Sequence, residues 1–383
     1  MARFEDWCLH AGFDPRGASL GVTASWVRTV LTYASFTRAG GWNDGESVTE
    51  PNVRSHLRGI SAFYARELLP DPLVQPGFNG ARLVQLSALL KSFSAADSPV
   101  QHKNPIPASV VLSIRHHARH LPMDCVPSLD SLLSLRIADL CEIAFLLLLR
   151  PSEYSGSPSR LHDACLTLGS LTFMHANGSI LFSEGAPTSL LPPGDLAHTL
   201  SEHSQQVCVS HGRQKNGERG EWQPFSRNDN YFSPLGLELC PVRSSSRLVH
   251  SLLQQHANAD TRLCYVSTST NSSHIVPKDI TNTLRSNVAR IGEAKLGVQA
   301  RHVSAHSLRT GGGYCYHLSG VGDAALRLLG RWKSDAFISY IKAKTSKTGL
   351  SASLLLKEAL QCKILFPFSR STAPKNVSTP TTK

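Results

Sequence analysis

Apolar residues in the first hundred positions recur at spacings of three and four, the period of an amphipathic helix. The pattern predicts helices that begin near Trp26, that cover 50–68 and that cover 81–91. Thr49 and Pro51 favour the start of the second helix, because threonine caps free amides and proline fits a first turn. Residues 92–105 are polar and show no apolar period, so they predict a linker. We place a domain boundary near Lys103 and expect a small helical domain over residues 1–103.

The remainder of the chain changes between helical and strand patterns. The three- and four-residue period returns over 107–121, 129–149, 277–291 and from 308 to about 341. Residues 165–183 follow a strand pattern around His-Ala-Asn-Gly, which is typical of a β-hairpin because Asn-Gly tolerates positive φ. A second strand pair is predicted at 206–211 and 221–225. The expected fold class is mainly α with a small antiparallel β-sheet (α+β), and the second domain covers residues 104–349.

Residues 350–383 form a separate C-terminal region in this interpretation. The leucines from Leu354 to Leu360 predict a helix within 350–360. Two interpretations of this helix stay open, because it either docks on a neighbouring protomer or packs on its own domain. The closing segment FPFSRSTAPKNVSTPTTK is polar and aperiodic, so we expect it to be disordered.

The charge balance indicates the kind of partner. The 383 residues include 39 Lys and Arg against 28 Asp and Glu, a formal charge of +11, which favours a polyanion such as nucleic acid. The longest apolar run, 143–149, is far shorter than a membrane span. Glu5 and Asp6 lie where a secretory signal would be apolar. We therefore expect an intracellular protein that does not enter a membrane.

Cysteine and histidine patterns bear on metal binding. The nine cysteines are scattered without a C-x-x-C pair, which predicts reduced thiols in place of a disulfide framework or a zinc knuckle. His116 and His120 share a helix face, with His117 beside them, but no carboxylate or cysteine follows at the spacing of a metal site. We expect no metal, and a metal at these histidines is the alternative.

The segment 304–341 holds the candidate chemistry. His306 and Arg309 lie three residues apart, so on a helix both side chains project from one face. A guanidinium grips two phosphate oxygens, and an imidazole donates a hydrogen bond or moves a proton. The glycines at 311–313 predict a tight turn that lets the backbone approach such a phosphate. The segment therefore predicts a phosphate site.

A wider set of residues resembles a known family. The order of six residues is similar to that in the tyrosine recombinases, or phage integrase family: Arg150 in LLLLRPSE, Lys215 in RQKNGERG, His306 and Arg309 in HSLRTGGG, Trp332 in LGRWKSD and Tyr340 in ISYI. The resemblance covers about residues 104–345, and the preceding helices look like the family's core-binding domain. HSLRTGGG followed by LGRWKSDAF is most similar to recombinases of DIRS and Crypton-type mobile elements.

The resemblance implies a role for each of these residues. Tyr340 would attack the scissile phosphate to form a 3′-phosphotyrosyl link, and Lys215 would protonate the departing 5′ oxygen. The implied phosphate ligands are Arg150 and Arg309, the implied positioning residues are His306 and Trp332, and the acidic residue that braces the site is Glu153. The resemblance implies no metal or cofactor. It also implies double-stranded DNA as the partner and a homotetramer assembled on it.

One interval departs from the family pattern. Tyr340 follows Trp332 by eight residues, one fewer than the nine usual in the family. Counting back nine residues from the tyrosine gives Arg331. Either Trp332 fills the penultimate catalytic position or Arg331 supplies a hydrogen-bond donor there, and we favour Trp332.

The candidates also have ordinary structural interpretations. Tyr340 can be an amphipathic packing residue, and Arg150 can neutralise the end of a core helix. Lys215 can be a solvated turn residue, with Arg213 as its competitor for the catalytic role.

The helix predicted over 50–68 carries a basic stripe. Arg54, Arg58 and Arg66 either meet DNA phosphates or form a solvated face. Our function hypothesis is a site-specific DNA recombinase or integrase, nuclear if the host is eukaryotic. Two alternatives are an inactive or reused DNA-binding relic of a mobile element and an enzyme that relaxes DNA in the manner of a type IB topoisomerase.

Overall fold

The computed structural model describes residues 2–13, 15, 24–42, 45–74, 82–97, 105–119, 128–156, 164–212, 221–228, 239–268 and 270–332. The chain divides into two compact units, Met1–Gln101 and His102–Lys383. This division lies close to the boundary predicted near Lys103, a residue outside the described ranges.

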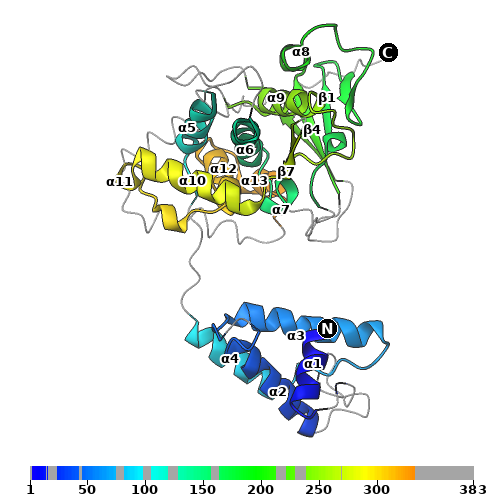
Figure 1. Cartoon of the computed structure of the whole chain (residues 1–383), viewed down its shortest axis with the longest axis vertical. Coiled ribbons are helices and arrows are strands. Elements are labelled where there is room, and N and C mark those ends of the chain that lie inside the picture. Colours follow the sequence, from blue (N-terminus) through cyan, green and yellow to red (C-terminus); the bar gives the residue numbers. More distant parts are fainter. Residues whose placement is uncertain are drawn as a thin grey trace, which may run out of the picture. The chain divides into compact units, whose positions relative to one another are not determined.

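The first unit consists of helices in its described residues (Figure 1). They are α1 (Ala2–His10), α2 (Ala24–Arg38), α3 (Glu50–Arg66) and α4 (Val84–Ala96). The apolar positions Val53, Leu57, Ile60 and Tyr64 of α3 are all buried, because their spacing places them on one helix face. The helix predicted over 50–68 is therefore confirmed, with its end two residues earlier.

The third predicted helix and the linker after it need a correction. The pattern placed the helix at 81–91 and the linker from 92 onward, whereas α4 continues to Ala96. Leu86 and Leu90 are buried in the core of this unit, and Phe93 packs against the same core. This apolar row keeps the chain helical through residues that look like a linker by composition.

The second unit combines nine α-helices, two short 3-10 helices and two antiparallel sheets in its described residues. The helices are α5 (Ala108–Arg119), α6 (Leu129–Leu146), α7 (Pro151–Tyr154), α8 (Leu196–His203), α9 (Pro241–Leu253), α10 (Pro277–Ile291), α11 (Glu293–Leu296), α12 (His306–Leu318) and α13 (Asp323–Leu329). The 3-10 helices are η3 (Leu168–Ser170) and η4 (Ala300–His302).

The strands are β1 (Leu171–Met174), β2 (Ile180–Ser183), β3 (Ala186–Pro187), β4 (Gln206–His211), β5 (Glu221–Ser226), β6 (Tyr265–Ser267) and β7 (Ser272–His274). The larger sheet has the order β3-β2-β1-β4-β5, and β6 pairs with β7. The expected class, mainly α with a small antiparallel sheet, is confirmed.

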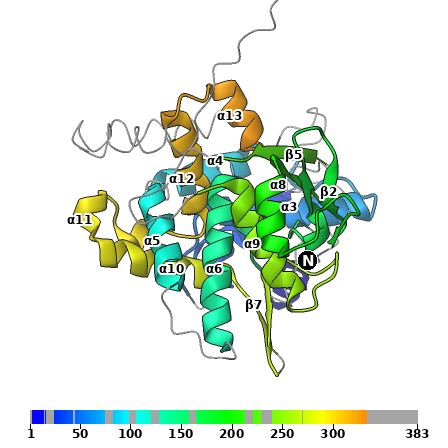
Figure 2. The same cartoon turned by 90° about the horizontal axis from the view of Figure 1, so that it is seen from above.

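Helix α6 is central to the second unit. It packs against α5, α9 and α12, and α9 also packs against β4 and β5. Figure 2 shows α9 between α6 and the five-stranded sheet, with α8 beside it. Residues 138–146 of α6 are all buried, because the helix has neighbours on most of its sides. The sheet and the helices therefore share one core.

Both predicted strand pairs are present. Strands β1 and β2 are joined by a turn in which Gly178 has a φ of 87°, as the Asn-Gly sequence predicts. Strands β4 and β5 pair from Gln206↔Ser226 to His211↔Glu221. Residues 165–170 were predicted as part of the first strand, but they lead into the 3-10 helix η3.

Two predicted helices end or break earlier than expected. Helix α6 ends at Leu146 instead of 149, and Leu148 has a left-handed φ of 51°. In its described part, to residue 332, the pattern predicted from 308 to about 341 is two helices, α12 and α13, separated near Gly320, which has a φ of 93°. Residues 333–341 lie outside the described ranges. At both breaks, backbone carbonyl groups leave the hydrogen-bonding pattern of a regular helix.

The three glycines at 311–313 correct another expectation. They lie inside α12 and form no tight turn. A Cβ atom at Gly312 would lie 2.0 Å from the carbonyl oxygen of Phe145, and one at Gly311 would lie 2.4 Å from that of Ile106. The close approach that Gly311 and Gly312 allow is to the protein's own backbone.

The cysteines largely follow the expectation of reduced thiols. Free, buried thiols are found at Cys8, Cys141, Cys165, Cys208, Cys240 and Cys264. The expectation does not hold at Cys315, which is disulfide-bonded.

The described helices give no sign of a membrane span or a metal site. None of them has the length and apolar character of a membrane span. Within the described ranges, no three His, Cys, Asp or Glu side chains are placed to hold a metal ion. His120, a member of the predicted histidine cluster, lies outside those ranges.

Candidate functional site

Residues that are far apart in the sequence meet at the start of α7. Arg150 precedes α7 as its N-cap residue, and Pro151 occupies its first turn. Glu153 accepts a hydrogen bond from the backbone N–H of Arg150 at 2.7 Å, so the short R-P-S-E sequence folds back on itself. Arg309 reaches this point from α12, and Arg331 reaches it from the turn after α13.

The Glu153 carboxylate joins two of these arginines. Its Oε1 accepts a hydrogen bond from Nη1 of Arg150 at 2.9 Å, and its Oε2 accepts one from Nη2 of Arg331 at 2.7 Å. Burial of Glu153 opposes ionisation, but Arg331, the Arg150 backbone N–H and the Arg309 charge together hold its pKa below the usual value. Glu153 is therefore an ionised brace between Arg150 and Arg331.

Arg309 is held by backbone carbonyl groups. Its Nη1 donates to the carbonyl oxygen of Leu148 at 2.6 Å, and its Nη2 donates to that of Gly330. The Trp332 ring covers the guanidinium, with its centroid 4.8 Å from Cζ. The early end of α6 matters for Arg309, because the carbonyl oxygen that accepts its hydrogen bond belongs to Leu148, the left-handed residue just after the helix.

Arg331 turns its side chain into the protein. Its Nη1 donates to the imidazole of His211 and to Oε1 of Gln223 at 3.2 Å. Its carbonyl oxygen accepts a hydrogen bond from Nη2 of Arg150 at 3.1 Å. Arg331 also has a left-handed φ of 50°, a conformation that costs free energy for a residue with a Cβ atom. Both the side chain and the backbone of Arg331 thus belong to the cluster.

His211 and Gln223 are site residues that the sequence reasoning missed. His211 is the last residue of β4, and Gln223 lies on β5. A signal for His211 was available, because Val207, Val209 and His211 have the same parity in the strand predicted over 206–211. That parity places the imidazole on the buried face, and all three residues are buried.

Among the residues that the structure describes, three guanidinium groups gather around one carboxylate. The guanidinium groups of Arg150, Arg309 and Arg331 face one carboxylate, Glu153. Burial and the nearby Arg150 and Arg331 cations lower the pKa of Arg309 to about 9. Burial and the Arg331 cation likewise lower the pKa of His211 to about 3, so its ring is neutral. An anion bound beside these guanidinium groups would be attracted by all three.

Solvent reaches the cluster mainly at Arg150. The side chain of Arg150 is 17% exposed, whereas those of Glu153 and Arg331 are 3% and 1% exposed. Arg309 is buried as a residue. In this arrangement Arg150 faces outward, and the other two arginines strengthen the positive field behind it.

The remaining predicted residues differ in how far the structure describes them. His306 begins α12 and is half-buried. The carbonyl of its neighbour Ala305 accepts a hydrogen bond from Tyr154 at 2.9 Å, so the start of α12 lies beside α7. Lys215 and Tyr340 lie outside the described residues.

The basic stripe on α3 belongs to the first unit. Arg54 forms an ion pair with Glu50 one turn earlier, and Arg66 pairs with Glu67 at 3.2 Å. Arg58 is exposed. The stripe is therefore partly neutralised by its own helix and the residue that follows it.

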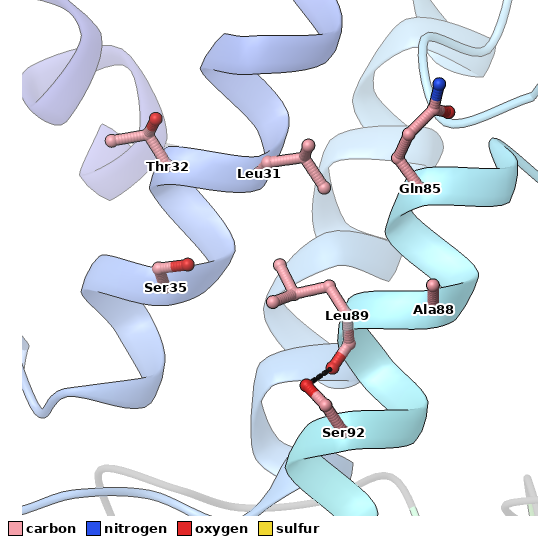
Figure 3. Close-up of a pocket in the computed structure, with 7 residues that line it drawn as sticks. All are labelled: Leu31, Thr32, Ser35, Gln85, Ala88, Leu89 and Ser92. Carbon is pink, nitrogen blue, oxygen red and sulfur yellow. Dashed lines mark hydrogen bonds between the residues drawn. The ribbon is translucent and has the colours of Figure 1, made fainter.

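An open depression lies between α2 and α4 of the first unit. Figure 3 shows Leu31 and Leu89 directed into the space between the two helices. The other lining residues are Thr32, Ser35, Gln85, Ala88 and Ser92. None of these side chains carries a charge, so the depression lacks the groups that would bind a phosphate.

Comparison with known proteins adds no family assignment. No protein-family model matches the chain, and no curated protein shows significant similarity to it. Functional inference therefore rests on the chemistry of the arginine cluster and on the residue pattern of the sequence.

Proposed function

We propose that this protein is a DNA strand-exchange enzyme of the tyrosine recombinase type. The observation that carries the proposal is the convergence of the guanidinium groups of Arg150, Arg309 and Arg331 around Glu153, at a point reached by solvent through Arg150. A phosphodiester is an anion whose charge grows on its non-bridging oxygens during displacement at phosphorus. Arginines held in place before the reaction stabilise that charge without having to reorganise.

The proposed reaction uses residues of this chain alone. The hydroxyl of Tyr340 gives its proton to the imidazole of His306 and attacks the scissile phosphorus. A new bond forms between phosphorus and the tyrosine oxygen, and the bond to the 5′ oxygen breaks. Lys215 gives a proton to the departing 5′ oxygen. Arg150 contacts the phosphate, Arg309 adds its charge from behind, and His306 at the start of α12 orients the phosphate. Attack by a 5′ hydroxyl of a partner strand reverses these steps and rejoins the DNA.

The fixed geometry of the arginines supports this assignment. Arg150 is oriented by Glu153 and by the carbonyl of Arg331, and Arg309 is oriented by two carbonyl groups. Trp332 covers one face of Arg309, which excludes water from that side. Such preorganisation is what phosphoryl transfer without a metal requires of the protein.

The proposal includes the partners of the reaction. Double-stranded DNA is the substrate, and four copies of the chain act together on two duplexes. With a net charge of +11, most of the affinity comes from contacts to DNA phosphates and falls as salt rises. In a eukaryotic host the site of action is the nucleus.

Covalent trapping tests the proposal. The full chain is incubated with a pool of nicked or phosphorothiolate duplexes and denatured in detergent, and DNA-linked protein is then measured for wild type and Tyr340→Phe. We expect an adduct in the wild type only, and sequencing of the trapped DNA identifies the target site. If the protein binds duplexes but forms no adduct, the proposed strand cleavage is wrong and the DNA-binding relic is the better description. An adduct with relaxation of supercoils and no joining to a second duplex would identify the topoisomerase-like alternative.

A further inference from the structure

The turn at 330–332 contacts both arginines of the proposed phosphate site. The carbonyl oxygen of Gly330 accepts a hydrogen bond from Arg309, and that of Arg331 accepts one from Arg150 at 3.1 Å. Two consecutive residues thus orient two guanidinium groups through their backbone. A displacement of this turn would move both arginines.

The Arg331 side chain anchors this turn from the inside. Its Nη2 donates to Glu153 at 2.7 Å, and only 1% of the side chain is exposed. That burial leaves it no surface for a DNA phosphate. The left-handed φ of Arg331 persists only where surrounding contacts hold the residue in place.

Two residues of the sheet supply such contacts. The His211 imidazole accepts a hydrogen bond from Arg331. Gln223 accepts another from Arg331 at 3.2 Å and donates its amide N–H to the carbonyl of Leu329 at 2.7 Å. Figure 2 shows the end of α13 beside β5, where these bonds are made. The β4–β5 hairpin and the 330–332 turn are therefore tied together.

We infer that His211 and Gln223 are positioning residues, which hold the 330–332 turn and, through it, Arg150, which contacts the phosphate, and Arg309 behind it. In this role Arg331 is itself a positioning residue and does not contact the phosphate. The binding of a DNA phosphate at these arginines rests on the proposed function, which this positioning role extends. It also explains why a histidine and a glutamine are buried on two neighbouring strands.

The hydrogen-bonding state of His211 defines the test. Arginine has only donors, so the ring nitrogen that faces Arg331 must accept, and the imidazole must be neutral. The other charged groups near the ring are Glu153 and Arg150. A glutamine side chain at position 211 can accept the same hydrogen bond, whereas a leucine cannot.

The experiment compares His211→Leu and Gln223→Met with two matched variants. His211→Gln restores the acceptor, and Gln206→Met makes the same change as Gln223→Met at a half-buried position of β4. Two quantities are measured on the full chain: the apparent affinity for inorganic phosphate, from the rise of the unfolding temperature, and the rate of covalent adduct formation on nicked duplex. Duplex affinity is measured beside them.

We expect His211→Leu and Gln223→Met to weaken phosphate affinity about tenfold, the loss of one hydrogen bond to a charged group. Adduct formation should slow by about 10- to 100-fold through misplaced arginines, while duplex affinity changes less than about threefold because most phosphate contacts lie elsewhere. His211→Gln should keep at least a third of the wild-type rate, and Gln206→Met should match the wild type.

Several outcomes would overturn the inference. It is wrong if His211→Leu and Gln223→Met both match the wild type. It is also wrong if His211→Gln loses as much phosphate affinity and adduct rate as His211→Leu, because the hydrogen-bond acceptor is then not what matters. If His211→Leu does not fold, as judged by circular dichroism, Gln223→Met against Gln206→Met decides. A wild type that forms no adduct, with phosphate affinity that still separates His211→Leu from His211→Gln, would refute the recombinase function and keep the positioning role. Absence of both phosphate binding and adduct would refute both.

Discussion

The second unit contains two buried groups of arginines that differ in charge balance. In the first group, Arg115 of α5 and Arg247 of α9 pair with Asp139 and Glu142 of α6. Two positive charges thus meet two negative charges. In the second group, three arginines share Glu153. Among the described residues, the ion pairs of the first group match each arginine with a carboxylate, whereas the second group has three arginines around one carboxylate.

The pKa values of the two groups shift in opposite directions. Burial opposes the charge of Arg115, but Asp139 and Glu142 raise its pKa. Burial and two neighbouring cations lower the pKa of Arg309 to about 9. Removing one charge from a paired, buried network leaves its partner uncompensated, which is costly. Under the proposed function, the first group links packed helices and the second binds a phosphate.

The largest expected effect comes from breaking the balanced group. Arg115→Met leaves Asp139 and Glu142 buried with one fewer cation, so we expect a loss of about 3–5 kcal/mol in the free energy of unfolding. Arg309→Met removes a cation that Arg150 and Arg331 repel, so the loss of its two hydrogen bonds is partly offset by less repulsion. We expect less than half the loss. Denaturant unfolding at pH 7 measures both, and an equal or larger loss in Arg309→Met would refute the contrast.

A second variant tests the close packing of α12, which carries Arg309, against α6. A Cβ atom at Gly312 would lie 2.0 Å from a carbonyl oxygen of α6, and backbone cannot yield cheaply there. We expect Gly312→Ala to cost about 3 kcal/mol and to move Arg309 away from Leu148, which weakens phosphate binding as well. The control is Gly59→Ala in α3, where nothing lies within 4 Å and alanine should add about 0.5–1 kcal/mol. A Gly312→Ala protein as stable as the wild type would show that α12 does not need this close approach.

The pH dependence of stability should also distinguish the groups. The pKa of His211 is about 3 in the folded protein and about 6.5 in the unfolded chain, so the unfolded state takes up a proton first as pH falls. This favours unfolding by about 2 kcal/mol between pH 6.5 and pH 5. Glu142, whose pKa is lowered to about 2 by Arg115 and Arg247 against the effect of burial, contributes stability above pH 4.5 that is lost toward pH 2.

Unfolding free energies at pH 7, 5 and 3 measure these effects. The difference between wild type and His211→Gln should change between pH 7 and pH 5, whereas the difference between wild type and Glu142→Gln should change only below about pH 4.5. Other titrating groups cancel in each difference. If the free energies of unfolding of wild type and His211→Gln keep a constant difference between pH 7 and pH 5, the ring has the pKa of an exposed histidine and the prediction is wrong.

The sequence predicted which elements and residues form the site better than it predicted how their side chains are arranged. The strand pair 206–211 and 221–225 follows from a local strand pattern, and Arg309 follows from its spacing to His306. Arg150 and Glu153 are expected only from the resemblance to the recombinase family, which rests on the order of residues far apart in the sequence.

The contacts that orient the arginines depend on tertiary structure. The leucines from 146 to 149 contain no residue that ends a helix, so the end of α6 at Leu146 could not be predicted. The left-handed φ of Arg331 had no signal either, because such positions favour glycine. The partners of Arg331 come from β4, β5 and α7, more than a hundred residues earlier. Single-sequence patterns carry no information on contacts at that separation.

The smallest expected effect concerns the exposed arginines of α3, which contrast with both buried groups. Arg58 is exposed, whereas Arg54 is engaged by Glu50. If Arg58 meets one DNA phosphate, Arg58→Ala should weaken duplex binding about fivefold at 0.15 M salt and reduce the slope of log affinity against log salt by about 1. Arg54→Ala should change that slope by less than half as much, because its charge is already paired. Equal, unchanged slopes in both variants would identify the stripe as a solvated face, and DNA contacts would then have to come from the second unit.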